Sequence, residues 1–476
     1  MFSLNEILEA LRGVRFKSTD FYFSEAVIDS RQLITGTLFV ALAGEKSDGH
    51  DYVAEAFRKG ALGALVAHEI AGTRSVDLRS TAAVIPTVAP EAPFCIIVDD
   101  PLAALQKIAA FHRAQLELTV VGITGTVGKS TTKELVYEVA SQSFRTLKNS
   151  GNLNNEIGLP LTLLRAGKGH QVAILEMGFY VPGEIKLLCD IANPEIGVIT
   201  NVGTVHAERA GSIETIAAGK SELVAELPET GVAILNYDDP HVLPMREKTR
   251  AQVLTYGLSP EADLYADEIE SFGLEGIRFR LHSRIGGEKE SYQIRVPLIG
   301  RHSVQTALRA VAVGRALGMS WEKIFKGLNN GQSHLRLSVM TTANGAMVID
   351  DTYNASPDSV LAALNLLKDL EGRKIAILGD MLELGRYETQ GHRTVGQAAA
   401  GICGELIAVG PRTKELVYAA INTGMNPDRI KWFATVDETI EYVRLRDFTI
   451  GETVLVKGSR GVHLEKLIDS LERKES

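Results

Sequence analysis

Short apolar runs alternate with helix-like stretches along most of the chain, a pattern typical of α/β proteins. Residues 118–123 form a β-branched apolar run that predicts a buried strand, and a helical pattern covers 131–144 after a glycine-containing turn. Further strands that each end in polar residues are predicted at 172–175, 196–200 and 232–235. Because ligands bind beyond the carboxyl ends of strands in open parallel sheets, this stretch predicts a ligand site.

The predicted elements group into three domains, a number that fits the length of 476 residues. The expected fold is α/β, with an N-terminal α/β domain (1–115), a central P-loop ATPase-type parallel sheet (116–331) and a C-terminal Rossmann-like, doubly wound domain (332–476). In the first domain, Asp99-Asp100-Pro101 is expected to cap a helix that reaches about Gln115.

The later part of the central domain changes character. Residues from about 250 to 298 keep strand signals but few helices, which suggests an antiparallel edge or a subdomain. Residues 303–317 predict an amphipathic helix. The last domain alternates strand and helix regularly, which favours a doubly wound parallel sheet. Its strands are predicted at 346–349, 375–378, 406–409 and 454–457.

Composition and charge narrow the class of protein. With 45% hydrophobic and 23% charged residues, the chain is expected to be a soluble globular protein. No apolar run approaches the roughly 18 residues of a membrane span, and the N-terminus has an early acid and no basic region, so we expect no signal peptide, no membrane insertion and a cytoplasmic location. A net charge of −9 argues against a nucleic-acid partner. The separated Cys95, Cys189 and Cys403 are expected to be reduced thiols.

The turn after the first central strand carries candidate phosphate-binding chemistry. It reads Gly125-Thr126-Val127-Gly128-Lys129-Ser130-Thr131 between a strand and a helix, the context that a P-loop needs. Backbone N–H groups and the helix N-terminus would cradle phosphates, Lys129 would reach the outer phosphates, and the Ser130 hydroxyl would bind Mg²⁺. The usual spacing asks for glycine where Ile123 stands, so an ordinary glycine turn is the alternative.

Other polar residues follow the neighbouring strands. Glu176 stands where P-loop enzymes place a Mg²⁺-binding acid, and His206 follows the next strand, so both could line one metal and phosphate site with Ser130. A histidine among oxygen ligands implies a second ion or a less particular metal. Lys220 lies on a predicted helix, and from physical chemistry alone an exposed, solvated lysine is favoured there. Residues 149–160 are polar and glycine-punctuated, and predict an exposed loop.

The chain resembles the Mur ligases, the ATP-dependent amide-forming enzymes of peptidoglycan precursor synthesis. Thr124-Gly-Thr-Val-Gly-Lys-Ser-Thr matches their P-loop and accounts for the unusual glycine spacing. The other matching motifs span the length of the chain: 29–31, 36–42, 48–50, 152–160, 350–358, 378–385 and 456–460. On physical grounds alone, Asp29-Ser-Arg31 and Asp48-Gly-His50 read as turn chemistry.

The resemblance implies roles for particular residues. Gly125, Thr126, Gly128, Lys129, Ser130 and Thr131 would bind ATP, Ser130 and Glu176 would hold Mg²⁺, and His206 would bind a second Mg²⁺. Lys220 matches a lysine that CO₂ carbamylates to serve that second ion, which requires a partly desolvated amine or one near other cations. Asn236 would lie near the adenosine, Arg336 would meet the γ-phosphate, and Asp351 would reach the nucleotide from the last domain. The first domain would hold uridine diphosphate through Ser30, and the muramoyl-peptide would face Asn154, Asn155 and Glu156.

Within the family, the motifs most resemble the branch that joins D-alanyl-D-alanine to UDP-N-acetylmuramoyl-tripeptide through an acyl phosphate. The implied products are UDP-N-acetylmuramoyl-pentapeptide, ADP and phosphate, and we expect a monomer. One segment departs from the family: Gly-x-His-Asn-x-x-Asn is here Gly300-Arg-His302-Ser303-Val-Gln305, which bears on adenine binding. One alternative is a sibling ligase that adds the third amino acid, but the Asp-Asn-Pro motif usual in the last domain of those enzymes is missing from this sequence. A second is folylpolyglutamate synthetase, which lacks this first domain. A third is a P-loop switch protein that hydrolyses ATP without ligation.

Overall fold

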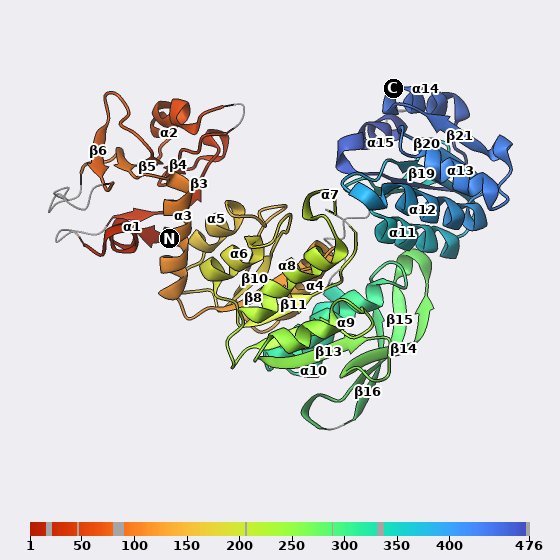
Figure 1. The fold of residues 1–476 in the computed structure, drawn as a ribbon, viewed down its shortest axis with the longest axis horizontal. Coiled ribbons are helices and arrows are strands. Elements are labelled where there is room, and N and C mark those ends of the chain that lie inside the picture. The colour runs from red at the N-terminus through yellow and green to blue at the C-terminus, as the bar shows by residue number, and fades with distance from the viewer. Residues whose placement is uncertain are drawn as a thin grey trace.

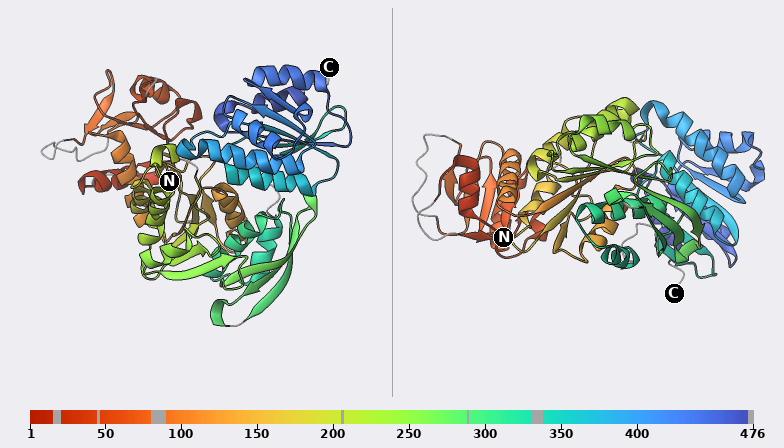
Figure 2. Two further views of the ribbon diagram at one scale, coloured as in Figure 1. Left: turned by 45° about the vertical axis from the view of Figure 1, so that its right-hand side comes forward. Right: turned by 90° about the horizontal axis from the view of Figure 1, so that it is seen from below.

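Each stretch of alternating strands and helices folds around its own sheet, and the resulting lobes follow one another in chain order (Figure 1). The computed structural model describes residues 1–15, 21–44, 47–79, 90–204, 207–287, 289–330 and 338–472. Seen from below, the N-terminal and C-terminal lobes lie at opposite ends of the central lobe (Figure 2). The predicted α/β class is confirmed.

The N-terminal lobe is a parallel sheet with strand order β3-β4-β5-β7-β6. The strands are β3 (Ala26–Val27), β4 (Leu38–Val40), β5 (Gly63–Val66), β6 (Arg74–Asp77) and β7 (Phe94–Ile97), and the helices are α1 (Leu4–Arg12), α2 (Val53–Arg58) and α3 (Pro101–Ala114). A ribbon of β1 (Phe2–Ser3) and β2 (Tyr22–Phe23) precedes them. As predicted, Asp100 caps α3, because its carboxylate accepts hydrogen bonds from the N–H groups of Leu102 and Ala103.

The central sheet has the order β16-β15-β14-β13-β12-β11-β8-β10-β9. Its strands are β8 (Thr119–Thr124), β9 (Thr146–Lys148), β10 (Val172–Glu176), β11 (Ile196–Ile199), β12 (Val232–Asn236), β13 (Gln252–Gly257), β14 (Leu264–Ser271), β15 (Ile277–Ser283) and β16 (Glu290–Val296). Strands β8 to β13 are parallel, whereas β14, β15 and β16 form an antiparallel meander. The predicted antiparallel edge is therefore confirmed.

Helices cover both faces of the central sheet. On one face lie α4 (Lys129–Ala140), α9 (Ser303–Ala316) and α10 (Trp321–Asn330); on the other lie α5 (Gly158–Leu164), α6 (Glu184–Ala192) and α8 (Ile213–Ala225). The short α7 (Ala207–Ala210) precedes α8. The helix predicted at 303–317 is present, but the prediction that it is amphipathic is wrong, because all residues from 303 to 314 except Gln305 are buried. Helix α9 packs against the sheet on one side and against α4 and α10 on the other, so little of its surface is exposed to solvent.

The C-terminal lobe confirms the predicted doubly wound sheet, with order β17-β18-β22-β19-β20-β21. Its strands are β17 (Ser338–Thr341), β18 (Met347–Asp351), β19 (Arg373–Gly379), β20 (Glu405–Val409), β21 (Ile430–Phe433) and β22 (Glu452–Lys457), all parallel except β17. Helices α11 (Pro357–Asp369), α12 (Glu388–Ile402) and α13 (Lys414–Asn422) cover one face, and α14 (Val436–Arg446) and α15 (Glu465–Glu472) cover the other.

Helix α3 joins the first two lobes through one continuous apolar core. It packs against α1 on one side and against α5 and α6 on the other. The buried Arg113 guanidinium near its end donates to the carbonyl oxygens of Leu118 (2.9 Å) and Ala192 (2.8 Å) and to the Glu195 carboxylate (2.8 Å). These contacts fix the start of β8 against the lobe before it.

The C-terminal lobe touches the central lobe at the carboxyl ends of their strands. The Glu208 N–H in α7 donates to the Glu383 carbonyl oxygen (3.3 Å). A Cβ added at Gly203, after β11, would lie 2.8 Å from the Asp358 carboxylate at the start of α11. Among the residues that the structure describes, none of the helices combines the length and apolar character needed to cross a bilayer.

A charged cluster at the amino ends of β20 and β22 allows a prediction about stability. Arg446 bridges the buried carboxylates of Glu405 (3.0 Å) and Glu452 (2.6 Å). Burial alone would raise the pKa of Glu452, but hydrogen bonds from Arg446 and the Thr449 N–H outweigh it and lower that pKa. We expect Arg446→Met to destabilise the C-terminal lobe at neutral pH by less than the about 3–5 kcal/mol of a fully unpaired buried charge, since both acids remain buried but Arg373 still contacts Glu405 (3.1 Å) and Glu452 (3.5 Å).

The sign of the pH dependence follows from the lowered Glu452 pKa. The stabilisation is complete above the unfolded value, roughly 4.3, and is lost as the pH falls through the lower folded value. The melting temperatures of wild type and Arg446→Met should therefore differ most at neutral pH and converge in acid. A constant difference down to acid pH would contradict this assignment. Thermal melts at several pH values, with the exposed-pair variant Lys186→Met as control, would decide it.

Candidate active site

Polar side chains gather where the parallel strands β12, β11, β8 and β10 end side by side. The adjacent carboxyl ends carry Asn236, Thr200, Thr124 and Glu176, and β8 continues into the glycine-containing loop. Of the residues predicted at strand ends, Glu176 and Asn236 lie at this edge of the sheet. His206 and Arg336 lie outside the residues that the structure describes.

The loop of residues 125–128 is held in a tight turn that needs its glycines. Gly125 (φ +149°) and Gly128 (φ +82°) lie at positive φ, and Gly128 is the N-cap of α4. A Cβ on Gly125 would lie 1.8 Å from the Thr200 hydroxyl. Asn201 fixes the turn, since its backbone carbonyl accepts from the Thr126 N–H (2.9 Å) and its side-chain oxygen from the Val127 N–H (2.8 Å).

The missing glycine of the usual P-loop spacing has a structural explanation. Ile123 is still part of β8 and is fully buried in the core beneath α4. The turn therefore begins only at Gly125, and the first residues of the helix follow Gly128 directly. Helix α4 begins at Lys129, two residues before the predicted start, and includes Ser130 and Thr131 in its first turn.

Lys129 and Ser130, which are neighbours in sequence, have different hydrogen-bond partners. The Lys129 ammonium donates to the carbonyl oxygens of Gly125 (2.8 Å) and Thr126 (3.1 Å). The buried Ser130 hydroxyl donates to Glu176 Oε2 (2.5 Å) at the end of β10. A hydroxyl and a carboxylate in contact beside a P-loop are oxygen donors of the type that Mg²⁺ prefers.

Glu176 is 2% exposed and is held from several sides. The Asn154 amide donates to its Oε1 (2.9 Å), and the Asn149 side chain bonds the Glu176 backbone N–H (2.9 Å) and carbonyl (3.0 Å). The prediction that 149–160 is an exposed loop is wrong at both ends. Asn149 is fully buried because it ties β10 to the loop, and residues from Gly158 onward form α5.

The three residues predicted to face the peptide have different surroundings in the structure. Asn154 reaches Glu176, but the Asn155 side-chain oxygen accepts from the Gly158 N–H (2.9 Å) at the start of α5. Glu156 is half-buried, and its backbone carbonyl accepts from Gln106 (3.1 Å) of α3. Of this predicted set, Asn154 is therefore the residue joined directly to the strand-end cluster.

Lys220 belongs to this site. Its ammonium is 1% exposed, donates to the Gly125 carbonyl (2.9 Å) and lies 4.9 Å from the centre of the Phe179 ring. Burial, and then the nearby Lys129, lower the pKa of Lys220 well below its usual value. The expectation of an exposed lysine from physical chemistry alone is wrong, because Gly219 lets α8 approach closely: a Cβ there would lie 2.0 Å from Phe179.

The remaining predicted residues lie farther along the sheet or in other lobes. Asn236 is buried at the end of β12 and contacts the Thr200 carbonyl (3.1 Å) and Gln305 (3.4 Å). Ser303 instead donates to the Ile299 carbonyl (2.7 Å), so Gln305 carries the polar contact at this spot. Ser30 is buried in the N-terminal lobe beside Glu55.

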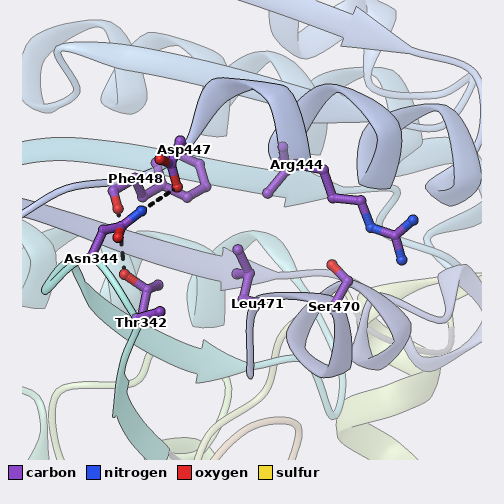
Figure 3. A pocket seen from close by; sticks show the side chains of 9 residues that line it. Thr342, Asn344, Arg444, Asp447, Phe448, Ser470 and Leu471 are labelled. Atoms are coloured by element: carbon purple, nitrogen blue, oxygen red, sulfur yellow. Dashed lines mark hydrogen bonds between the residues drawn. The ribbon is translucent and has the colours of Figure 1, made fainter. Parts of the chain in front are cut away.

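Asp351 ends β18 in the C-terminal lobe, where Lys457 at the end of β22 contacts its carboxylate at 2.6 Å. A small cavity lies at the other end of this sheet, among Thr342, Asn344 and Asp447, where the Asn344 amide donates to the Asp447 carboxylate (Figure 3). Its volume of about 30 Å³ admits only water-sized molecules. It is therefore separate from the strand-end site.

Sequence reasoning missed buried groups beside the site that sit inside helices. Lys133 of α4 donates to the Asn149 carbonyl (2.8 Å), and Arg309 of α9 donates to the Thr132 hydroxyl (2.6 Å). Both side chains are buried. Helical spacing gave a signal for Lys133, which lies three and seven residues before the buried Val136 and Ala140.

The family models match the chain in three consecutive segments. Residues 24–113 match the Mur ligase family catalytic domain, 123–314 the Mur ligase middle domain, and 335–460 the Mur ligase glutamate ligase domain. Together these segments cover most of the chain and include the P-loop, Glu176 and Lys220.

Individual relatives agree over nearly the full length. The UDP-N-acetylmuramoyl-tripeptide–D-alanyl-D-alanine ligase of Bacillus subtilis is 35% identical, over 93% of this chain and 92% of the relative. A crystal structure of MurF from Acinetobacter baumannii has a TM-score of 0.84 at 31% identity, covering 99% of this chain and 98% of its own. MurF ligase from Thermotoga maritima in complex with ADP has a TM-score of 0.78 at 25% identity, covering 96% and 99%. The chain therefore belongs to the Mur ligase family.

Proposed function

We propose that the protein joins D-alanyl-D-alanine to UDP-N-acetylmuramoyl-tripeptide, using ATP and releasing UDP-N-acetylmuramoyl-pentapeptide, ADP and phosphate. The observation that carries the proposal is the convergence of Lys129, Ser130, Glu176 and the buried Lys220 on the loop at Gly125. The names of relatives that match nearly the whole chain support the choice of substrates. We expect the enzyme to act in the cytoplasm as a monomer.

ATP is assigned to the central lobe. The backbone N–H groups of the 125–131 turn and the Lys129 ammonium would contact its phosphates, and Asn236 with Gln305 would lie near the adenosine. Arg336 and Asp351 would complete the nucleotide site from the domain that we place at 332–476. The domain at 1–115 would hold the uridine diphosphate with Ser30, and Asn154, with Asn155 and Glu156, would face the peptide.

The donor set fits Mg²⁺ at Ser130 and Glu176, since both offer oxygen and already contact each other. Bound there, Mg²⁺ would offset the repulsion between a carboxylate and the triphosphate. We propose a second ion at His206 and a carbamylated Lys220. A neutral Lys220 amine would add to CO₂, forming an N–C bond and losing a proton, and the cation beside Lys129 would become an anion. Repulsion between the two ammonium groups that share the Gly125 carbonyl would then become attraction.

The ligation itself follows from carboxylate chemistry. A carboxylate is a poor acyl donor because it is anionic and has no good leaving group, so its oxygen first attacks the γ-phosphorus of ATP; an O–P bond forms, and the bond to ADP breaks. The D-alanyl-D-alanine amine then attacks the carbonyl carbon, an N–C bond forms, phosphate leaves and the amine loses a proton. Lys129 would hold the γ-phosphate, and closure of the C-terminal lobe would exclude water from the acyl phosphate.

The test is phosphate release from ATP with UDP-N-acetylmuramoyl-tripeptide, with and without D-alanyl-D-alanine, combined with the mass of the product. Release that needs both substrates, with a pentapeptide product, is expected. Dependence on another amino acid would favour a sibling ligase. Release with no co-substrate would favour an ATP-driven switch, an alternative that the buried Lys220 already argues against, because a switch has no need of a second metal ligand.

We expect Gly125→Ala to lower kcat at least about tenfold, because the added methyl group would clash with Thr200 and force the turn open. ATP affinity should fall as well. Gly401→Ala is a matched control, since a Cβ at that position of α12 meets nothing within 4 Å. Wild-type turnover in Gly125→Ala would show that the turn does not position the phosphates.

A further inference from the structure

Lys133 is a buried cation that the proposed ligation does not use. It lies on the inner face of α4, one turn after Ser130, and is 1% exposed. Its ammonium donates to the Asn149 carbonyl (2.8 Å) and lies 3.3 Å from the Glu134 carboxylate and 3.9 Å from Glu176 Oε2. It therefore connects the phosphate-loop helix, the end of β10 and the segment that follows β9.

The loop from Asn149 to Ile157 forms hydrogen bonds with both the backbone and the carboxylate of Glu176. The Asn149 side chain holds the Glu176 backbone, and the Asn154 amide holds its Oε1. Ser130 and Lys133 approach Oε2 from α4. One carboxylate is thus oriented jointly by the P-loop helix and by the loop assigned to the peptide substrate.

A lysine at this position carries a desolvation cost that an apolar side chain would avoid. Replacing a whole buried ion pair by apolar groups is often neutral or stabilising, although removing one partner alone leaves the other charge buried. A methionine would fill the same space on the inner face of α4 beside Val136. The charge is better explained by what it orients than by the packing it supplies.

We propose that Lys133 is a positioning residue that couples the Asn149–Ile157 loop to the Glu176 carboxylate. Its ammonium fixes the loop through the Asn149 carbonyl and holds the Oε2 side of Glu176 in register with Ser130. Occupation of the loop by the acceptor peptide and the geometry of the metal-binding carboxylate then depend on each other. This inference rests on the proposed function for its substrates, but the coupling itself is a property of these residues.

The experiment compares Lys133→Met and Lys133→Gln with wild type. Glutamine keeps a hydrogen-bond donor on the side chain, whereas methionine has none, and both lack the charge. The matched control is Lys148→Met, since Lys148 also pairs with Glu134, and its ammonium lies 4.0 Å from the centre of the Tyr137 ring. The measurements are kcat, the Mg²⁺ dependence of ADP affinity by calorimetry, and hydrogen exchange of residues 149–157.

For both Lys133 variants we expect kcat, and the ADP affinity gained on adding Mg²⁺, to fall about tenfold or more, the usual effect of losing an outer-shell partner. ADP affinity without Mg²⁺ should stay within about twofold of wild type. Exchange in 149–157 should rise more in Lys133→Met than in Lys133→Gln. Lys148→Met should match wild type throughout.

Folded Lys133 variants with normal Mg²⁺-dependent ADP affinity and normal loop exchange would overturn the coupling, whatever their melting temperature. If Lys133→Met does not fold, Lys133→Gln alone decides between the two results. Failure of the proposed function is distinguishable, because it would appear as missing pentapeptide in wild type. The ADP and exchange measurements need no acceptor and remain interpretable in that case.

Discussion

Lys220→Ala is expected to lower kcat by about a thousandfold, at the upper end of the effect of deleting one electrostatic contact in an active site. Its ammonium is fully buried beside the Gly125 carbonyl, where burial and Lys129 favour the neutral amine that carbamylation requires. Depleting CO₂ should inactivate wild type, and bicarbonate should restore it. Bicarbonate should restore nothing in the alanine variant, because there is no amine to modify.

Two further variants sharpen this test. Lys220→Arg keeps a cation but offers no amine that CO₂ can modify, so it should be as inactive as alanine. Lys248→Ala is the control, since Lys248 is exposed and contacts Ser221, the next residue of α8. A ¹³C-labelled carbamate signal from ¹³CO₂ should be present in wild type and in Lys248→Ala. Substantial activity in Lys220→Arg would refute a carbamate at this position.

The strands and their polar ends could be predicted because they depend on local pattern. A buried parallel strand is a short apolar run, and the residue that follows it must lie at the sheet edge, which placed Glu176 and Asn236 correctly. The P-loop was recognisable for the same reason. A strand with few apolar residues was missed. Strand β6 reads Arg-Ser-Val-Asp, which has no strand-like apolar pattern, and it is a strand because it pairs with β7.

The interior of the site could not be predicted, because it depends on packing between distant segments. Asn149 looks like a loop residue, yet its side chain satisfies the backbone of Glu176, which is 27 residues away. The side-chain N–H of Asn149 donates to the Glu176 carbonyl, and its side-chain oxygen accepts from the Glu176 N–H. Lys220 looks solvated until α8 packs closely against Phe179 at Gly219, which places the ammonium on the Gly125 carbonyl. In both cases a polar side chain is buried because a specific tertiary partner satisfies it, and such partners leave no periodic signal.

Lys129 and Lys220 illustrate how the buried charges depend on one another. Both ammonium groups donate to the carbonyl of Gly125, while the hydroxyl of Ser130, the residue after Lys129, donates to Glu176. The turn is thus in contact with two cations, and its helix with a carboxylate. Phosphate oxygens call for the cations and a divalent ion for the carboxylate, whereas an ordinary glycine turn between strand and helix needs neither.

Lys129→Met should lower kcat by about two to three orders of magnitude, because no other described side chain of the turn can place a cation on the outer phosphates. The fold should persist, since Lys129 is only half-buried and its present hydrogen bonds are to backbone carbonyls at the loop surface. ATP affinity should fall more than ADP affinity, since the lysine is assigned to the γ-phosphate side. Calorimetry with ADP and a non-hydrolysable ATP analogue, and phosphate release at saturating ATP, measure these effects.

The control is Lys186→Met, which removes an exposed lysine of α6 paired with Asp190, far from the loop in sequence and outside the strand-end cluster. It should leave both affinities and kcat unchanged. Equal losses of ADP and ATP-analogue affinity in Lys129→Met would place the lysine on the inner phosphates instead. Unchanged turnover would mean that the turn does not bind the nucleotide, and would return it to a structural connection between β8 and α4.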